Sequence, residues 1–122
     1  MTFPEPTHEL AFTGGQTLAR CLYRPGLLFR MRGLLGRSSL TCGTGIWLQP
    51  CNSIHMFFMG FAIDALFLDR GLRVVRVVEH LAPWSLVWPV KGAFSCVEVP
   101  AGSAGEWEIK VGQDLEMRVL EP

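Results

Sequence analysis

One stretch of this chain, Cys51–Asp69 (CNSIHMFFMGFAIDALFLD), restricts the possible folds more than any other. Within Ile54–Leu68 every residue is apolar except His55, Gly60 and Asp64, and four phenylalanines lie in this one run. Burying each phenylalanine ring stabilises a fold by roughly 1.5–3 kcal/mol, so the segment is expected inside the protein. A histidine and an aspartate in such a run need polar partners, because burying a polar side chain without one is costly.

The length and composition predict a single globular domain that covers residues 1–122. Hydrophobic residues make up 49% of the chain and charged residues 18%, which excludes intrinsic disorder. A membrane span is not expected, because the longest apolar run is shorter than the ~20 residues that a spanning helix needs. The first ten residues, MTFPEPTHEL, lack the apolar core of a signal peptide, and the four cysteines form no CxxC motif. We therefore expect a cytoplasmic protein with buried thiols.

Short runs rich in β-branched and aromatic residues, separated by glycine and proline, predict a mainly β fold. About seven short strands are expected, arranged as an antiparallel sandwich or a flattened barrel. The clearest hairpin joins 62–69 to 72–80 across Asp69-Arg70-Gly71. The other expected strands are 8–13, 17–23, 45–49, 54–59, 95–99 and 114–120, while 82–92 is expected to be a loop and 101–112 to hold a loose helical turn.

The one expected helix is Pro25–Leu35. Its leucines and Met31 recur on one face at the 3.6-residue period. Pro25 suits the first helical position and Gly36 suits the position just after the end. The predicted fold is therefore a β structure with one short helix docked on it.

His55 and Asp64 are the first candidate site residues, and two interpretations stay open. In the structural one, Asp64 accepts backbone N–H groups or pairs with an arginine, by preference Arg37, and fixes a corner of the core. In the functional one, both residues lie at the rim of a pocket and Asp64 orients His55 as a general base. No nucleophile motif such as GxSxG accompanies them, so a hydrolase is an alternative and no catalytic residue is assigned.

Cys51, His55, Met56 and Met59 carry ligand types that suit copper(I). In an extended strand, however, Cys51 and Met59 would lie about 26 Å apart, too far to share one ion. The methionines are better explained as fillers of the core beside the phenylalanines. We therefore expect neither a metal nor a cofactor.

Two further sets of residues could bind a partner. Trp84 and Trp88 lie in a proline-bounded segment and could line a ligand mouth or a protein interface, or could cover the sheet. The stretch from Arg20 to Arg37 contains five arginines and no acidic residue, which makes it a possible anion or nucleic-acid site. Nucleic acid is the less favoured partner, because exposed aromatic residues are not interleaved with these arginines.

Four segments together resemble the domain-of-unknown-function family 192, a family of small bacterial and archaeal proteins. They are RMRGLLGR (30–37), CNSIHMFFMGFAIDALFLD (51–69), GLRVVRVVEHLAPW (71–84) and VEVPAGSAGEWEIKVGQDL (97–115). The family pattern matches at His55, Met59, Asp64 and Arg37, and its PAG motif falls on Pro100–Gly102. Met56 replaces the usual threonine, and Gly60 and Ala62 stand where arginine and proline are common. The resemblance implies a mainly β single domain and assigns no activity.

The sequence thus predicts a small binding module whose ligand is a small molecule or a protein. The tentative binding residues are His55, Met59, Asp64, Arg37, Trp84 and Trp88.

Overall fold

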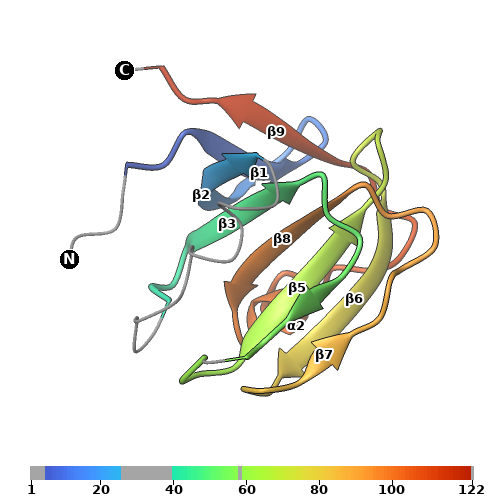
Figure 1. Ribbon diagram of the computed structural model, residues 1–122. Coiled ribbons are helices and arrows are strands. Elements are labelled where there is room, and N and C mark those ends of the chain that lie inside the picture. Colours follow the sequence, from blue (N-terminus) through green and yellow to red (C-terminus); the bar gives the residue numbers. More distant parts are fainter. Residues whose placement is uncertain (1–4, 26–39, 58, 122) are drawn as a thin grey trace.

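The computed structural model describes residues 5–25, 40–57 and 59–121. It contains a large seven-stranded sheet, a separate two-stranded sheet and a helix of a single turn (Figure 1). The large sheet has the order β6-β5-β8-β3-β2-β1-β9, and the small sheet pairs β4 with β7. The elements are β1 (His8–Phe12), β2 (Thr17–Pro25), β3 (Thr44–Gln49), β4 (Ile54–His55), β5 (Ile63–Leu68), β6 (Val74–Leu81), β7 (Leu86–Val87), β8 (Ser95–Pro100), α2 (Ser103–Glu106) and β9 (Leu115–Val119).

Six strand pairs of the two sheets are antiparallel, and one pair, β2 with β3, is parallel. A parallel pair needs a long crossover connection, and the segment between Pro25 and Thr44 provides it. The sheet is therefore mixed rather than purely antiparallel. The prediction of a mainly β, flattened-barrel fold is confirmed.

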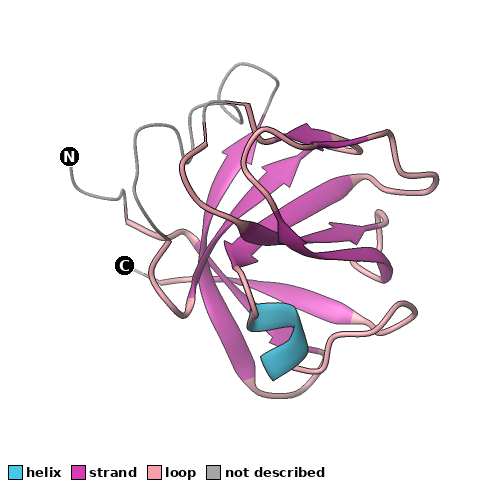
Figure 2. Cartoon of the chain, turned by 90° about the horizontal axis from the view of Figure 1, so that it is seen from below, coloured by secondary structure: helices cyan, strands magenta, loops and turns pink. Residues whose placement is uncertain are grey.

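The large sheet curls until its two edge strands meet at one end. Arg73, just before β6, bridges Asp114, just before β9. The Val74 N–H donates to the Gln113 carbonyl at 2.9 Å, and the Leu115 N–H donates to the Leu72 carbonyl at 3.0 Å. Figure 2 shows the curl from below, with helix α2 beside the strands. The result is a half-barrel that is closed at one corner.

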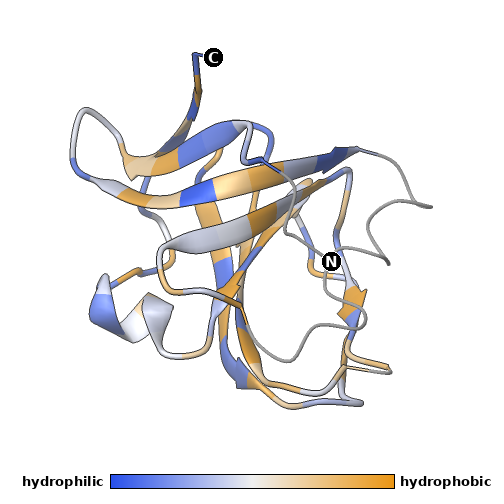
Figure 3. Ribbon diagram, turned by 90° about the vertical axis from the view of Figure 1, so that its left-hand side faces the viewer, coloured by the Kyte–Doolittle hydropathy of each residue, from blue (hydrophilic) through white to orange (hydrophobic). Residues whose placement is uncertain are grey.

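Buried apolar residues lie on both faces of the large sheet, which explains why its strands lack a clean polar alternation. Figure 3 shows hydrophobic stretches, in orange, along the strands of the sheet. The inner core draws buried residues from all seven strands, among them Leu10, Trp47, Leu66 and Val97. The outer layer, which includes Ile46, Ala65 and Cys96, lies against the small β4–β7 sheet. Strand β5, between β6 and β8 in the sheet, is buried along its whole length, as the phenylalanine-rich run predicts.

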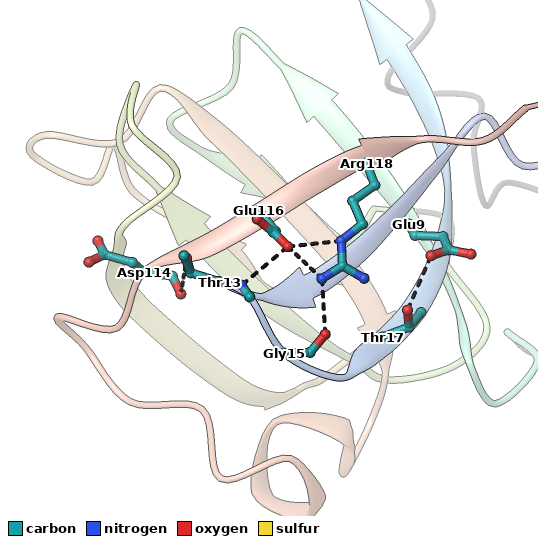
Figure 4. A network of polar contacts seen from close by, with 8 residues as sticks. Glu9, Thr13, Gly15, Thr17, Asp114, Glu116 and Arg118 are labelled. Atoms are coloured by element: carbon teal, nitrogen blue, oxygen red, sulfur yellow. Dashed lines mark hydrogen bonds and ion pairs between the residues drawn. The ribbon is translucent and has the colours of Figure 1, made fainter.

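A polar network on the surface ties the tip of the β1–β2 hairpin to β9 (Figure 4). The Arg118 guanidinium donates to the Gly15 carbonyl at 2.9 Å and contacts the Glu116 carboxylate. The same carboxylate accepts the Gly14 N–H at 3.3 Å, and Thr13 donates to the Asp114 carbonyl at 3.1 Å. Exposed ion pairs contribute roughly 0–1 kcal/mol, so this network fixes a corner rather than drives folding.

Most predicted elements are confirmed, with shifted ends. Strand 54–59 is shorter than predicted, since only Ile54–His55 pairs, and the loop 82–92 contains the short strand β7. The expected helical turn within 101–112 is present as α2.

The predicted start of a helix at Pro25 is wrong, because Pro25 ends strand β2, where it pairs with Gln49. The rest of that predicted helix lies outside the described residues. None of the described helices is long and apolar enough to cross a membrane.

All four cysteines lie within the described residues and are thiols rather than disulfides. Cys42 is exposed, whereas Cys21, Cys51 and Cys96 are buried. Burial raises the pKa of Cys21 to about 12, partly offset by a backbone hydrogen bond at Leu10. Its thiolate fraction at mildly alkaline pH is thus on the order of 1000-fold below that of an ordinary thiol.

We expect iodoacetamide to modify Cys42 first and the native protein to take up one label per chain. Intact-mass spectrometry measures the number of labels, and Cys42→Ser is the control that should remain unlabelled over the same period. Equal labelling of Cys21 and Cys42 in the native state would contradict the packing of the inner core.

Candidate functional site

Beside the outer face of the small β4–β7 sheet lie the exposed aromatic residues of the described part of the chain. Ile54 pairs with Val87, and both are buried against the outer layer. The next pair, His55 with Leu86, therefore lies on the opposite side of this sheet. Leu86 is 45% exposed, and His55 is partly exposed. One face of the small sheet thus packs on the protein while the other is left to solvent.

The remaining members of this surface flank the small sheet. Trp88 is 75% exposed, Trp84 59% and Phe57 38%. The His55 ring stacks on Phe57 with the centroids 4.7 Å apart, and Phe57 in turn lies 6.1 Å from Trp84. We call the set His55, Phe57, Trp84, Leu86 and Trp88 the aromatic patch.

Backbone hydrogen bonds hold the patch in place. The Trp84 N–H donates to the Met56 carbonyl at 2.7 Å, and the Met56 N–H donates to the Ser85 carbonyl at 2.8 Å. The Phe57 N–H approaches His55 Nδ1 at 3.4 Å. With Nδ1 as the acceptor, the neutral His55 ring carries its proton on Nε2. Trp84 adopts a positive φ of 68°, which bends the chain where it enters the patch.

Asp64 does not belong to this surface. Its neighbours Ile63 and Ala65 face the outer layer, so the Asp64 side chain lies on the other face of β5, where it is fully buried. Its carboxylate accepts three backbone N–H groups, from His80 at 2.8 Å, Gly102 at 3.0 Å and Ala104 at 2.9 Å.

Of the two interpretations left open by the sequence, this arrangement supports the structural one. The carboxylate ties the end of β6 and the β8–α2 turn to β5, and its partners among the described residues are backbone N–H groups. It is not available to orient His55. Arg37 lies outside the described residues.

Met59 and Cys51 are buried in the outer layer. The Cys51 thiol donates to the Ser53 carbonyl at 3.1 Å. Among the described residues, no group of three or more histidine, cysteine or acidic side chains could hold a metal ion. The structure therefore brings together His55 and Trp84 through Phe57, places the exposed Trp88 two residues after Leu86, and leaves Met59 and Asp64 inside the protein.

Sequence reasoning missed one residue, Glu98, which lies in the middle of β8 and is only 7% exposed. Burial raises the pKa of its carboxyl group to about 8, and the electrostatic influence of the nearby Cys51 adds a smaller contribution in the same direction. The signal was present in SCVEVP, where an acidic residue stands between two valines that face the inner core. Glu98, like Asp64, is an acidic residue within an apolar run, and burying such a side chain is costly unless it has a polar partner.

Comparison with known proteins places the chain among uncharacterised relatives. The model of the DUF192 family, described as "Uncharacterized ACR", matches residues 28–117. A UPF0127 protein from Thermococcus sibiricus is 36% identical over 69 residues, which are 57% of this chain and 44% of that protein. A UPF0127 protein from Pyrococcus abyssi is 39% identical over 64 residues, which are 52% of this chain and 54% of that protein. The chain thus aligns with about half the length of these relatives.

Two crystal structures share the fold. A protein of unknown function from Novosphingobium aromaticivorans superposes with a TM-score of 0.77 at 19% identity, covering 90% of this chain and 83% of the other. A protein from Sinorhizobium meliloti, described as a candidate transcription regulator, superposes with a TM-score of 0.79 at 17% identity and covers 96% of both chains. Because the family model spans most of the sequence, the chain belongs to the DUF192 family.

Proposed function

We propose that this protein is a binding module that docks a protein partner on the aromatic patch. The observation that carries the proposal is the exposure of a leucine on one face of a small sheet, and of two tryptophans and a phenylalanine that flank it, while the other face of the sheet is buried. Contiguous exposed apolar surface is uncommon on monomeric proteins and marks interaction sites. Tryptophan is also the residue most enriched among the hot spots of protein interfaces.

A partner with apolar side chains suits this surface better than a substrate does. The patch consists mainly of large apolar side chains that are exposed to solvent, and His55 is its only titratable member. The His55 ring is stacked on Phe57, and among the described residues no carboxylate hydrogen-bonds to it. The hydrolase alternative therefore lacks the oriented base that it requires.

Binding of nucleic acid through the arginine-rich stretch has less support. Arg20 and Arg24 are its members in β2, and Arg20 is exposed. The other arginines of the stretch, Arg30, Arg32 and Arg37, lie outside the described residues. The Sinorhizobium protein shares the fold at 17% identity, so its description does not extend to the arginines of this chain.

We also propose a cytoplasmic location. Four thiols without a disulfide fit a reducing compartment, where such groups persist.

The test compares two double variants that remove equally exposed apolar side chains. Trp84→Ser/Trp88→Ser removes the centre of the patch, and Val111→Ser/Val119→Ser removes two valines that are 65% and 71% exposed elsewhere. Proteins captured by the wild type from a lysate of the source organism are identified, purified and titrated against all three forms. We expect the patch variant to bind its partner at least about 30-fold more weakly, and the valine variant to bind like the wild type.

Both double variants should keep the stability of the wild type to within about 0.5 kcal/mol, because the altered side chains are exposed. Thermal unfolding checks this. Equal affinity of the patch variant and the wild type for every captured partner would refute the proposed site.

A further inference from the structure

Strand β9 is an edge strand whose outer side is open beyond the closed corner of the half-barrel. It stands last in the strand order of the large sheet, with β1 as its neighbour (Figure 1). At the corner, the N–H of Leu115 donates to the Leu72 carbonyl just before β6. From Glu116 to Val119, no strand of the described chain lies along the outer side of β9. An edge of this kind is a template for a further strand.

The hydrogen-bond pattern of β9 shows which backbone groups lie on the open side. The N–H of Leu120 donates to the Thr7 carbonyl, toward β1, whereas that of Leu115 donates in the opposite direction. Because these directions alternate along an antiparallel pair, the N–H and C=O groups of Met117 and Val119 point away from β1. None of these groups has a hydrogen-bond partner on the open side within the described chain.

The side chains along the open edge suit pairing with a further strand. Met117 packs partly on the inner core, and Val119 follows it on the same face and is 71% exposed. Glu116 and Arg118 lie on the other face, where they form an ion pair and Arg118 also donates to the Gly15 carbonyl at 2.9 Å (Figure 4). The edge therefore has apolar side chains on one face and mutually neutralised charges on the other.

We propose that the open edge of β9 pairs with the same edge of a second copy of this chain. The two strands run antiparallel about a two-fold axis, the commonest symmetry of soluble oligomers. Met117 of each copy lies opposite Val119 of the other, so that the open N–H and C=O groups of both copies bond to one another. The exposed Val119 side chain then packs on Met117 of the other copy, as apolar cross-strand neighbours do. This surface is independent of the aromatic patch.

Neighbouring registers of the two strands fit less well. A register centred on Met117 would bring Val119 of the second copy beside Leu115, where the chain before β6 already lies. A register centred on Val119 would place the exposed Glu121 opposite Met117. In the proposed register the two Arg118 residues lie opposite each other, and each guanidinium is neutralised by the ion pair within its own chain. The pairing therefore joins apolar side chains and leaves no charge uncompensated.

Sedimentation equilibrium of the full chain, from about 10 µM to about 1 mM, tests the dimer. Few residues take part in the pairing, so we expect a dissociation constant on the order of 0.1 mM. The weight-average mass should then rise with concentration from that of one chain toward that of two. A mass that stays at the monomer value up to about 1 mM would overturn the proposal.

Amide hydrogen exchange, followed by NMR at both ends of this concentration range, identifies the surface that pairs. The N–H groups of Met117 and Val119 should exchange about fivefold more slowly at the high concentration, because about four-fifths of the chains are then paired. The N–H groups of Glu116 and Arg118 bond to β1 in either state and should change little. Dimer formation without slower exchange at Met117 and Val119 would overturn the proposal.

Two variants introduce the same charge at positions of similar exposure. Val119→Lys places an ammonium group opposite Met117 of the other copy and should weaken dimerisation at least about 10-fold. Trp88→Lys is the matched control, since Trp88 is 75% exposed on the aromatic patch, and it should dimerise like the wild type. Thermal unfolding at about 10 µM verifies that each variant is folded.

Val119→Pro tests the backbone bonds directly. Proline removes an N–H group on the open side and leaves the bonds between β9 and β1 in place, as prolines on edge strands do. It should weaken dimerisation at least about 10-fold. Undiminished dimerisation of Val119→Lys or of Val119→Pro, or loss of the dimer in Trp88→Lys, would each overturn the proposal.

Discussion

Replacing Asp64 with alanine should lower the free energy of unfolding by about 3 kcal/mol or more. The change removes the acceptor of three backbone N–H groups, those of His80, Gly102 and Ala104. Each buried donor left without an acceptor costs about 1–3 kcal/mol, and water does not reach a side chain that is fully buried. Denaturant unfolding followed by tryptophan fluorescence measures the loss.

Asp69→Ala is the matched control for this prediction. The Asp69 carboxylate also accepts two backbone N–H groups, from Gly71 and Arg73, each at 2.9 Å. These donors lie in an exposed hairpin turn, so water replaces the lost acceptor and the expected cost is about 1 kcal/mol. Similar losses in the two variants would mean that Asp64 does not tie the β6 end and the β8–α2 turn together. Asp64→Asn should be destabilised as well but should keep its affinity for the partner of the aromatic patch.

The stability of the protein should fall as pH rises, and Glu98 should be the cause. Its ordinary pKa is 4.5, whereas burial raises the pKa of the folded-state carboxyl group to about 8. Between these values the unfolded chain has lost the proton that the folded protein still holds, so unfolding releases a proton. The free energy of unfolding therefore decreases by about 1.4 kcal/mol per pH unit across this window, about 4–5 kcal/mol in all. The contribution is fully present below pH 4.5 and is lost by pH 8.

Glu98→Gln isolates this contribution, because the amide has nearly the same shape and does not ionise. Urea unfolding of the wild type and of the variant at pH 5, 6, 7 and 8 measures the difference in stability at each pH. We expect the free energy of unfolding of the variant, relative to that of the wild type, to increase steadily from pH 5 to pH 8. Parallel stability curves would show that the Glu98 carboxyl group is not held neutral by its surroundings.

The β class of this fold could be read from the sequence because strand signals are local. The run around Phe67 and the Asp69-Arg70-Gly71 turn sufficed to predict β5, β6 and their hairpin, which the structure confirms. The parallel pairing of β2 with β3 could not be predicted in this way, since it depends on contacts between segments far apart in the chain. Pro25 shows the same limit, because its suitability for a helix start was outweighed by pairing with β3.

The candidate site was predicted in part for similar reasons. The sequence left open whether Trp84 and Trp88 line a ligand mouth or interface or instead cover the sheet, and in the structure both are exposed. His55 and Asp64 were grouped because they lie close in sequence, but β5 directs Asp64 to the face opposite the small sheet. The neighbours of Glu98 come from β3, β5 and the segment before β4, so its setting could be seen only in the folded chain.

The pairing of the first strand with the last has a consequence for how the protein is made. Strand β9 adds to the sheet beside β1, and nearly the whole chain separates the two. Closing so long a loop is slow, and until it closes β1 presents an unprotected edge to other nascent chains. The half-barrel is therefore completed only after β9 has itself been synthesised and has left the ribosome.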